Sequence, residues 1–115
     1  MKPIRYPLSQ QTELVSNIER LAEFSPAAAA GFEALRAPAR SHSTLTEREK
    51  QLILLAGFAA TKNEGGFRVH CLRARDEGVT RQELEQLVLL MLGTSLGLAP
   101  TVECLFWLDD EVPAS

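Results

Sequence analysis

The chain has 115 residues and a mass of 12.7 kDa, the size of a single domain. It is 45% hydrophobic and 23% charged, which is typical of a globular protein and excludes a disordered chain. A net charge of -3 gives no basic surface for nucleic acid or an anionic membrane. The longest apolar run, Leu52–Ala60, is about half of a bilayer span, and the first residues do not resemble a signal peptide. We therefore expect a cytoplasmic protein.

Cysteine and histidine are both scarce. Cys71 and Cys104 are too widely spaced for a common zinc pattern, and the cytosol would keep both thiols reduced. His42 and His70 are the only histidines, so we expect neither a metal site nor a bound cofactor. The chain also lacks the glycine-rich nucleotide motifs, the serine nucleophile elbow and the zinc-protease motif.

The first half of the chain predicts two helices. Apolar residues recur at helical spacing over residues 9–24. Ser25 and the proline after it are typical of a helix start, and they open an alanine-rich segment that continues through Leu35. Pro38 should end this second helix, so that residues 40–43 form a polar linker.

The second half predicts further helices with sharper boundaries. Thr46 and Glu49 have the spacing of a capping box, which opens a helix to about Lys62. Two adjacent glycines make residues 63–66 a break, after which a helix should run over residues 67–77.

Local signals also place the last two helices. Gly78 is positioned as a left-handed helix end, and Thr80 with Glu83 forms a second capping box. A short final helix is expected from Pro100 through Leu108, followed by a solvated acidic tail at residues 109–115.

Together these elements predict an all-α, single-domain helical bundle over residues 1–115, because no strand pattern competes. We expect N-terminal helices and a linker in residues 1–43, and the core of the domain in residues 44–108.

Two segments, Leu52–Ala60 and Leu87–Leu92, are apolar on every face, which is more than a chain of this size readily buries. One alternative is a tight central pair within one bundle. The favoured alternative is a homo-oligomer that covers one face of each helix, with the small residues between Gly93 and Gly97 in the contact.

One ordered set of residues resembles a known family. It combines both capping boxes with a histidine and two small residues at one-turn intervals after it: Thr46, Glu49, His70, Ala74, Gly78, Thr80 and Glu83. This order is similar to the carboxymuconolactone decarboxylase family, whose relatives include the alkylhydroperoxidase-D-like proteins. The resemblance covers roughly the last seventy residues. It implies the alkylhydroperoxidase-D-like helical fold, assembled as a homotrimer or homohexamer with sites near the subunit contacts.

The chain departs from the peroxidase branch of that family. The branch carries Cys-x-x-Cys ending four residues before the histidine, and those positions here are Asn63 and Gly66. Its glutamate, about twelve residues before the first cysteine, corresponds to Gln51. Both thiols and the acid are therefore absent.

The lactone-decarboxylase branch fits better, since it also lacks the cysteines. That branch typically has Glu-Leu-x-x-His, which in this chain becomes Gly66-Phe67-x-x-His70. The apolar position is retained and the acid is lost. Glu64 is the nearest carboxylate that would substitute for it as a catalytic group.

His70 is the main catalytic candidate, because a neutral imidazole exchanges a proton near neutral pH. Decarboxylation of an unsaturated lactone acid needs an enolate to be stabilised and a proton to be delivered to carbon. We expect Arg68, Arg73, Arg75 or an arginine from another subunit to bind a substrate carboxylate, and Trp107 to line the pocket. The competing interpretation is a histidine that simply hydrogen-bonds a carbonyl at a packing contact.

Three functions follow from these residues. The leading one is a cofactor-free decarboxylase or related lyase acting on a small carboxylated lactone or ring acid. The second is a thiol peroxidase that uses Cys71 or Cys104 in a non-standard way, although both have the pattern of buried packing residues. The third is a non-catalytic family member that binds a small ligand or assembles with itself.

Overall fold

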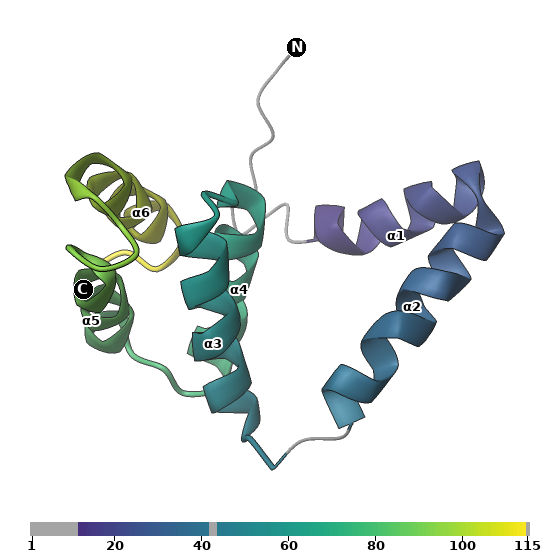
Figure 1. Ribbon diagram of the computed structural model, residues 1–115, viewed down its shortest axis with the longest axis horizontal. Helices are drawn as coiled ribbons and strands as arrows, with labels where there is room; N and C mark the ends of the chain where they lie inside the picture. The colour runs from purple at the N-terminus through teal and green to yellow at the C-terminus, as the bar shows by residue number, and fades with distance from the viewer. Residues whose placement is uncertain (1–11, 42–43, 115) are drawn as a thin grey trace.

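The computed structural model describes residues 12–41 and 44–114, with side chains from Asn17 onward. This part of the chain is all-α, and Figure 1 shows its helices in chain order. The helices are α1 (Thr12–Phe24), α2 (Pro26–Ser41), α3 (Glu47–Ala60), α4 (Glu64–Asp76), α5 (Arg81–Met91) and α6 (Leu98–Glu111). The predicted fold class is therefore confirmed.

Local capping places the helix starts where the sequence predicts them. The side chain of Thr46 accepts from the backbone N–H of Glu49, and the Glu49 carboxylate accepts from Thr46, completing a capping box on α3. Thr80 forms the same box at the start of α5. Ser25 Oγ accepts from the N–H of Ala28 at 3.1 Å, which caps α2. Gly78 has φ +88°, the left-handed conformation expected of it.

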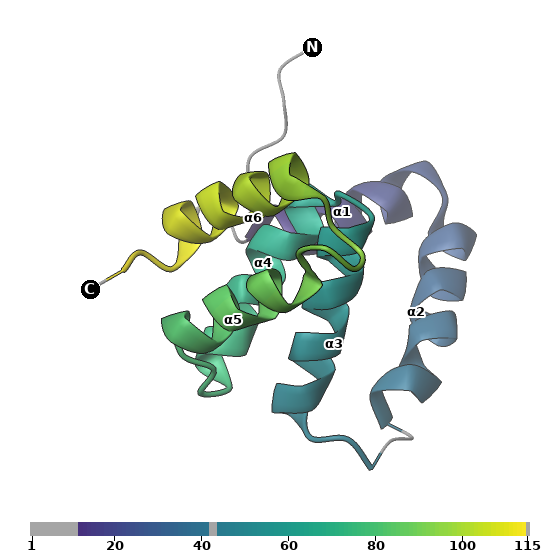
Figure 2. The same ribbon diagram turned by 60° about the vertical axis from the view of Figure 1, so that its left-hand side comes forward.

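Helix α4 is the centre of the fold. Its residues from Phe67 to Leu72 are all buried, so this segment is covered on every side. Helices α3 and α6 pack directly against α4, and α5 packs against both α3 and α6. Figure 2 shows α5 and α6 on one side of α4, with α3 beside it. The largest fully buried side chains include Leu55 of α3, Leu84 of α5 and Leu108 of α6.

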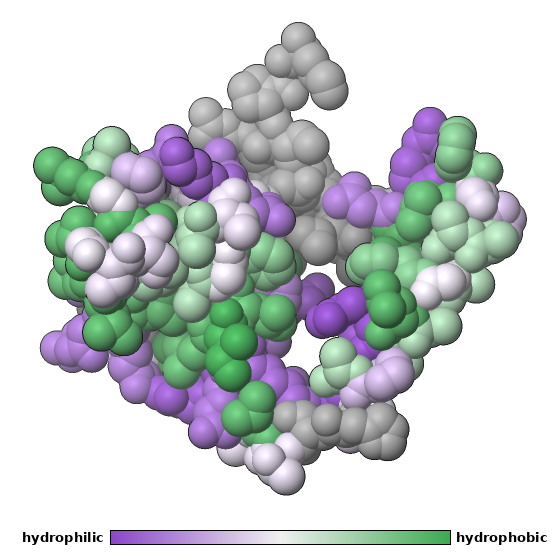
Figure 3. All heavy atoms as spheres, viewed as in Figure 1, coloured by the Kyte–Doolittle hydropathy of each residue, from purple (hydrophilic) through white to green (hydrophobic). Residues whose placement is uncertain are grey.

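Helices α1 and α2 form a hairpin, here called the arm, that stands away from the other four helices (Figures 1 and 2). Within α2 only Ala29 is buried. Lys50 Nζ of α3 donates to the carbonyl oxygen of Arg40 at 2.9 Å and so holds the end of the arm. Figure 3 shows open space between the arm and the rest of the molecule, with hydrophilic atoms along its edge.

Two predicted boundaries in the first part of the chain are wrong. Helix α2 continues through Pro38 to Ser41, because Ala37, Ala39 and the arginines around the proline favour a helix enough to tolerate one missing hydrogen bond. Helix α4 begins at Glu64, and the expected break is shorter: Asn63 caps the helix by accepting from the Gly66 N–H at 2.9 Å. Positions 9–11, 42 and 43 of the predicted helix and linker lie outside the described residues.

The predicted acidic tail is also wrong, since residues 109–111 are the last turn of α6. Their carboxylates bind buried or partly buried arginines. The Asp109 and Asp110 side chains remain about half exposed, whereas Glu111 is 2% exposed. The helix also starts before Pro100, at Leu98. A proline in the first turn needs no N–H for the helix, so it does not mark the exact start.

Apolar side chains remain exposed along α5 and α6. In the segments that were expected to be covered, Leu55, Ala59, Val88 and Met91 are buried within the chain itself. The exposed apolar surface, here called the α5–α6 patch, consists of Leu89, Leu90, Leu92, Leu98, Val102 and Phe106. It is part of the hydrophobic surface visible in Figure 3. No helix in the described ranges is both long and apolar enough to cross a bilayer.

Self-association through the α5–α6 patch is our first testable prediction. Leu90 and Phe106 are 79% and 64% exposed, so Leu90→Glu or Phe106→Glu should leave the monomer fold intact and lower the mass measured by sedimentation. Leu35→Glu is a matched control, because this leucine of α2 is 73% exposed. A wild-type protein that is monomeric at micromolar concentration would contradict the prediction.

Candidate active site

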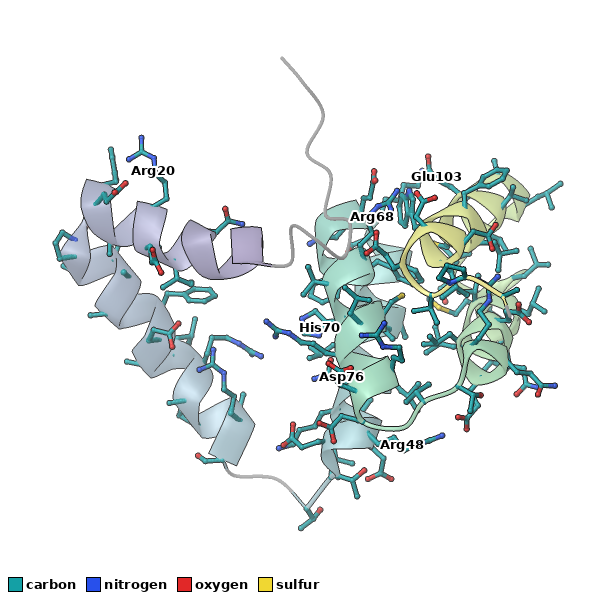
Figure 4. All side chains as sticks on the ribbon, turned by 180° about the vertical axis from the view of Figure 1, so that it is seen from behind. Arg20, Arg48, Arg68, His70, Asp76 and Glu103 are labelled. Atoms are coloured by element: carbon teal, nitrogen blue, oxygen red, sulfur yellow. The ribbon has the colours of Figure 1, made fainter. Side chains whose placement is uncertain are left out.

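The candidate site is centred on His70, which lies on the side of α4 that faces the arm (Figure 4). Its side chain is buried against α3, and only 8% of the residue is exposed. The Nδ1 atom lies 2.6 Å from Gln51 Oε1. The ring of Phe58 packs on the imidazole, with 5.0 Å between ring centroids and a tilt of 37°. Gln51 and Phe58 are seven residues apart on α3, so both lie on one face of that helix.

The contact with Gln51 determines how the imidazole is protonated. An amide oxygen only accepts hydrogen bonds, so His70 Nδ1 carries the proton and donates it. In the neutral ring, Nε2 then holds the lone pair. Nε2 has no partner among the described residues, and Glu111 Oε1 is their only fully buried unpartnered side-chain oxygen or nitrogen. Nε2 therefore keeps some contact with solvent, although only 8% of the residue is exposed.

Burial and two positive charges make His70 a weak base. Burial lowers its pKa most, and the guanidinium groups of Arg73 and Arg36 lower it further, to about 4. At neutral pH the imidazole is therefore uncharged. Arg73 lies three residues after His70 on α4, whereas Arg36 comes from α2 in the arm. The site thus contains groups from α2, α3 and α4.

Glu64 and Arg68, both predicted as site residues, lie away from the imidazole. Glu64 is six residues before His70, which places it about 120° around the helix. It binds Arg68 Nε at 2.8 Å instead. Asp110 accepts from Arg68 at 2.8 Å and Glu111 at 2.9 Å, so three carboxylates surround this guanidinium. Each of the three nitrogens of the Arg68 guanidinium therefore binds a carboxylate. Figure 4 shows Arg68 beside α6.

Arg68 and Glu111 are the buried members of the Arg68 cluster, in which three carboxylates surround one cation. Burial alone would lower the Arg68 pKa, but hydrogen bonds to Glu111, Asp110 and Glu64 outweigh it, and the pKa is raised. Burial also raises the pKa of Glu111, whose side chain is fully enclosed. Glu111 Oε2 accepts from Arg68, while Oε1 has no hydrogen-bond partner in the described residues. These charges hold α4 to α6 and leave Arg68 no capacity for a substrate.

The remaining predicted site residues, Trp107 and Arg75, also lie in different parts of the fold. Trp107 is 7% exposed and packs against Phe67 at 5.8 Å between ring centroids, in the core between α4 and α6. Arg75 is exposed and bound to Asp76. Of the predicted arginines, only Arg73 acts on His70.

Neither cysteine is placed for redox chemistry. Cys71 and Cys104 are free thiols, both buried in the core. Burial strongly raises the pKa of Cys71, and it raises the pKa of Cys104 to about 11. A thiol needs a lowered pKa to attack a peroxide at neutral pH, so both groups are in the wrong environment. Within the described ranges, no three His, Cys, Asp or Glu side chains are grouped to hold a metal ion.

Three residues of the site were not predicted as functional: Gln51, Phe58 and Arg36. The sequence did single out Gln51, because it stands where the peroxidase branch has its glutamate. It indicated only that this acid is absent. The Phe58 ring fits in this position because residue 66 is glycine. An added Cβ at Gly66 would lie 2.6 Å from the phenyl ring. The ring that covers His70 therefore uses the space that a side chain at position 66 would need. No sequence signal pointed to Arg36.

A comparison with protein-family models assigns the chain to a family. The model of the Carboxymuconolactone decarboxylase family matches residues 26–101, which is more than half of the chain and includes α2 to α5. The chain therefore belongs to the Carboxymuconolactone decarboxylase family. No curated protein and no solved structure gives a significant match.

The lowered pKa of His70 predicts how stability depends on pH. Between about pH 4 and pH 6.5 the unfolded chain binds a proton at His70 that the folded chain excludes. The free energy of unfolding should therefore fall as the pH drops through this window, by up to about 2–3 kcal/mol from this residue. His70→Gln should remove that part of the dependence. Urea unfolding of both proteins across the window tests this, and parallel curves would contradict it.

Removing the Arg68 charge should be strongly destabilising. Arg68→Met leaves three carboxylates without their cation, one of them fully enclosed, and should cost about 3–5 kcal/mol at neutral pH. This loss of stability should be smaller at acidic pH, because Glu111 becomes protonated there and loses its buried charge. Arg75→Met, at an exposed position of the same helix, should change stability by less than about 0.5 kcal/mol. A loss that is equal at acidic and neutral pH would contradict this account.

Proposed function

We propose that the protein is a cofactor-free lyase of the decarboxylase type, acting on a small carboxylated lactone or ring acid. The observation that carries the proposal is the His70–Gln51 pair, which orients the imidazole and leaves Nε2 in contact with solvent. The family of the chain is named for such a reaction, and the imidazole is the one neutral proton-transfer group in this part of the fold.

The reaction needs one proton for each turnover. The bond between the ring carbon and the substrate carboxylate breaks, carbon dioxide leaves, and the electron pair moves into the conjugated lactone carbonyl as an enolate. His70 Nε2, after taking a proton from solvent, delivers it to the enolate at carbon and returns to the neutral form. Positive charge from Arg73 and Arg36 stabilises the enolate while it exists.

Gln51 suits this role because it orients the ring without a charge. Its oxygen accepts from Nδ1 in both the neutral and the protonated imidazole, so the ring keeps its position during proton transfer. A carboxylate at this position would hold the imidazole protonated instead. We infer that Gln51 is a positioning residue and His70 the catalytic one.

A non-catalytic role is the second candidate, and one observation favours it. Among the described side chains no carboxylate contacts His70, and Glu64 is bound to Arg68 on another face of α4. A family member that has lost its acid and keeps only a binding pocket would have this arrangement. The thiol peroxidase is disfavoured, because both cysteines are buried with raised pKa values.

Turnover of carboxymuconolactone, followed by carbon dioxide release, tests the proposed function. His70→Gln should lower kcat about 100-fold or more, because it removes the only proton donor, and the oligomer mass should not change. Gln51→Leu should lower kcat less and shift its pH profile, as expected of a positioning residue. Glu77→Gln, an exposed change at the end of the same helix, is the control. Equal turnover by wild type and His70→Gln would leave the non-catalytic role as the better account.

A further inference from the structure

Two arginines differ from the others in lacking a partner. Within the described residues, Arg36 and Arg73 make no ion pair and no side-chain hydrogen bond, although the chain has a net charge of -3. The remaining described arginines all bind carboxylates: Arg20, Arg40, Arg48, Arg68, Arg75 and Arg81. These two unpaired arginines both act on the same imidazole.

The position of Arg36 in the arm supports a shared site. Along α2 only Ala29 and Arg36 are shielded from solvent to any extent, and they lie seven residues apart on one face. Arg36 therefore points inward while its neighbours on α2 are exposed. Arg73 follows His70 by one turn of α4, on the same side of that helix. Both charges act on His70, which lies on the side of α4 that faces the arm (Figure 4), and Figure 3 shows open space between the arm and the rest of the molecule.

We propose that Arg36 and Arg73 bind the carboxylate of a small organic acid beside His70, with the arm forming one wall of the site, and that this binding is coupled to proton uptake by the imidazole. The inference rests on the proposed function and specifies how its substrate is held. Guanidinium groups from two helices can each give paired hydrogen bonds to a carboxylate, which favours an acid over a neutral ring.

The coupling follows from the charges around His70. From α3 the imidazole contacts Gln51 and Phe58, which do not titrate, and the positive charges of Arg73 on α4 and Arg36 on α2 act on it. No group of α5 or α6 acts on it. A bound carboxylate neutralises the two arginines and adds a negative charge nearby, so it raises the pKa of His70. The ligand thereby prepares the proton that the reaction consumes.

Calorimetric titration with 5-oxotetrahydrofuran-2-carboxylate tests the proposal. This lactone acid is saturated and has no conjugated carbonyl to accept electrons, so it binds without reacting. We expect γ-butyrolactone, which lacks the carboxylate, to bind at least tenfold more weakly. Arg36→Gln and Arg73→Gln should each weaken binding about tenfold, and Arg36→Lys should restore part of it. Arg40→Gln removes the same charge from α2 at a position paired with Glu33, and should bind like the wild type.

Proton uptake is measured by repeating the titration near pH 6 in two buffers of different ionisation enthalpy. The wild type should take up a fraction of a proton on binding, and His70→Gln should take up none while it still binds. Equal binding of the acid and the neutral lactone, no binding at millimolar concentration, or unchanged binding by Arg36→Gln would each overturn the proposal. Binding without proton uptake would overturn the coupling.

The outcomes separate this inference from the proposed function. If the acid binds as expected but carboxymuconolactone is not turned over, the lyase function fails and the anion site stands. If turnover depends on His70 but not on Arg36 or Arg73, the function stands and the anion site is wrong. Circular dichroism melting of each arginine variant verifies that it is folded before either conclusion is drawn.

Discussion

The guanidinium of Arg68 is the charge around which the other helices are arranged. It lies within the most deeply buried segment of the chain, and a charge in that position must be compensated by partners. Glu64 compensates it from the same helix, and Asp110 and Glu111 do so from α6. The end of α6 must therefore fold back against the start of α4. The core formed by Phe67 and Trp107 closes between the two helices as a result.

The same helix separates this structural charge from the reactive group. Arg68 and His70 are two residues apart, and a helix turns about 100° per residue, so their side chains leave α4 in nearly opposite directions. One side carries three carboxylates, whereas on the other the described residues bring an amide, a phenyl ring and the charges of two arginines to the imidazole. The negative charges that hold the fold together are thus kept from the imidazole, which stays neutral in their absence.

Local signals in the sequence were sufficient to predict that the chain is helical and where α3 and α5 begin. Capping boxes at Thr46 and Thr80 and the left-handed Gly78 depend on neighbouring residues, so they could be predicted from the chain alone. The end of α6 could not be predicted in this way, because Glu111 is buried by an ion pair with a residue 43 positions away. Arg36 was missed for a related reason. Its role depends on α2 lying opposite α4, and nothing in the spacing of α2 encodes that arrangement.

The contact between Gly66 and Phe58 has a consequence for how this chain could change over evolutionary time. A cysteine at position 66 would collide with the phenyl ring, whereas shortening Phe58 first would open a void beside His70. A thiol motif at positions 63 and 66 would therefore require Phe58 to change together with Asn63 and Gly66, because a side chain at position 66 and the ring that covers His70 cannot occupy the same space.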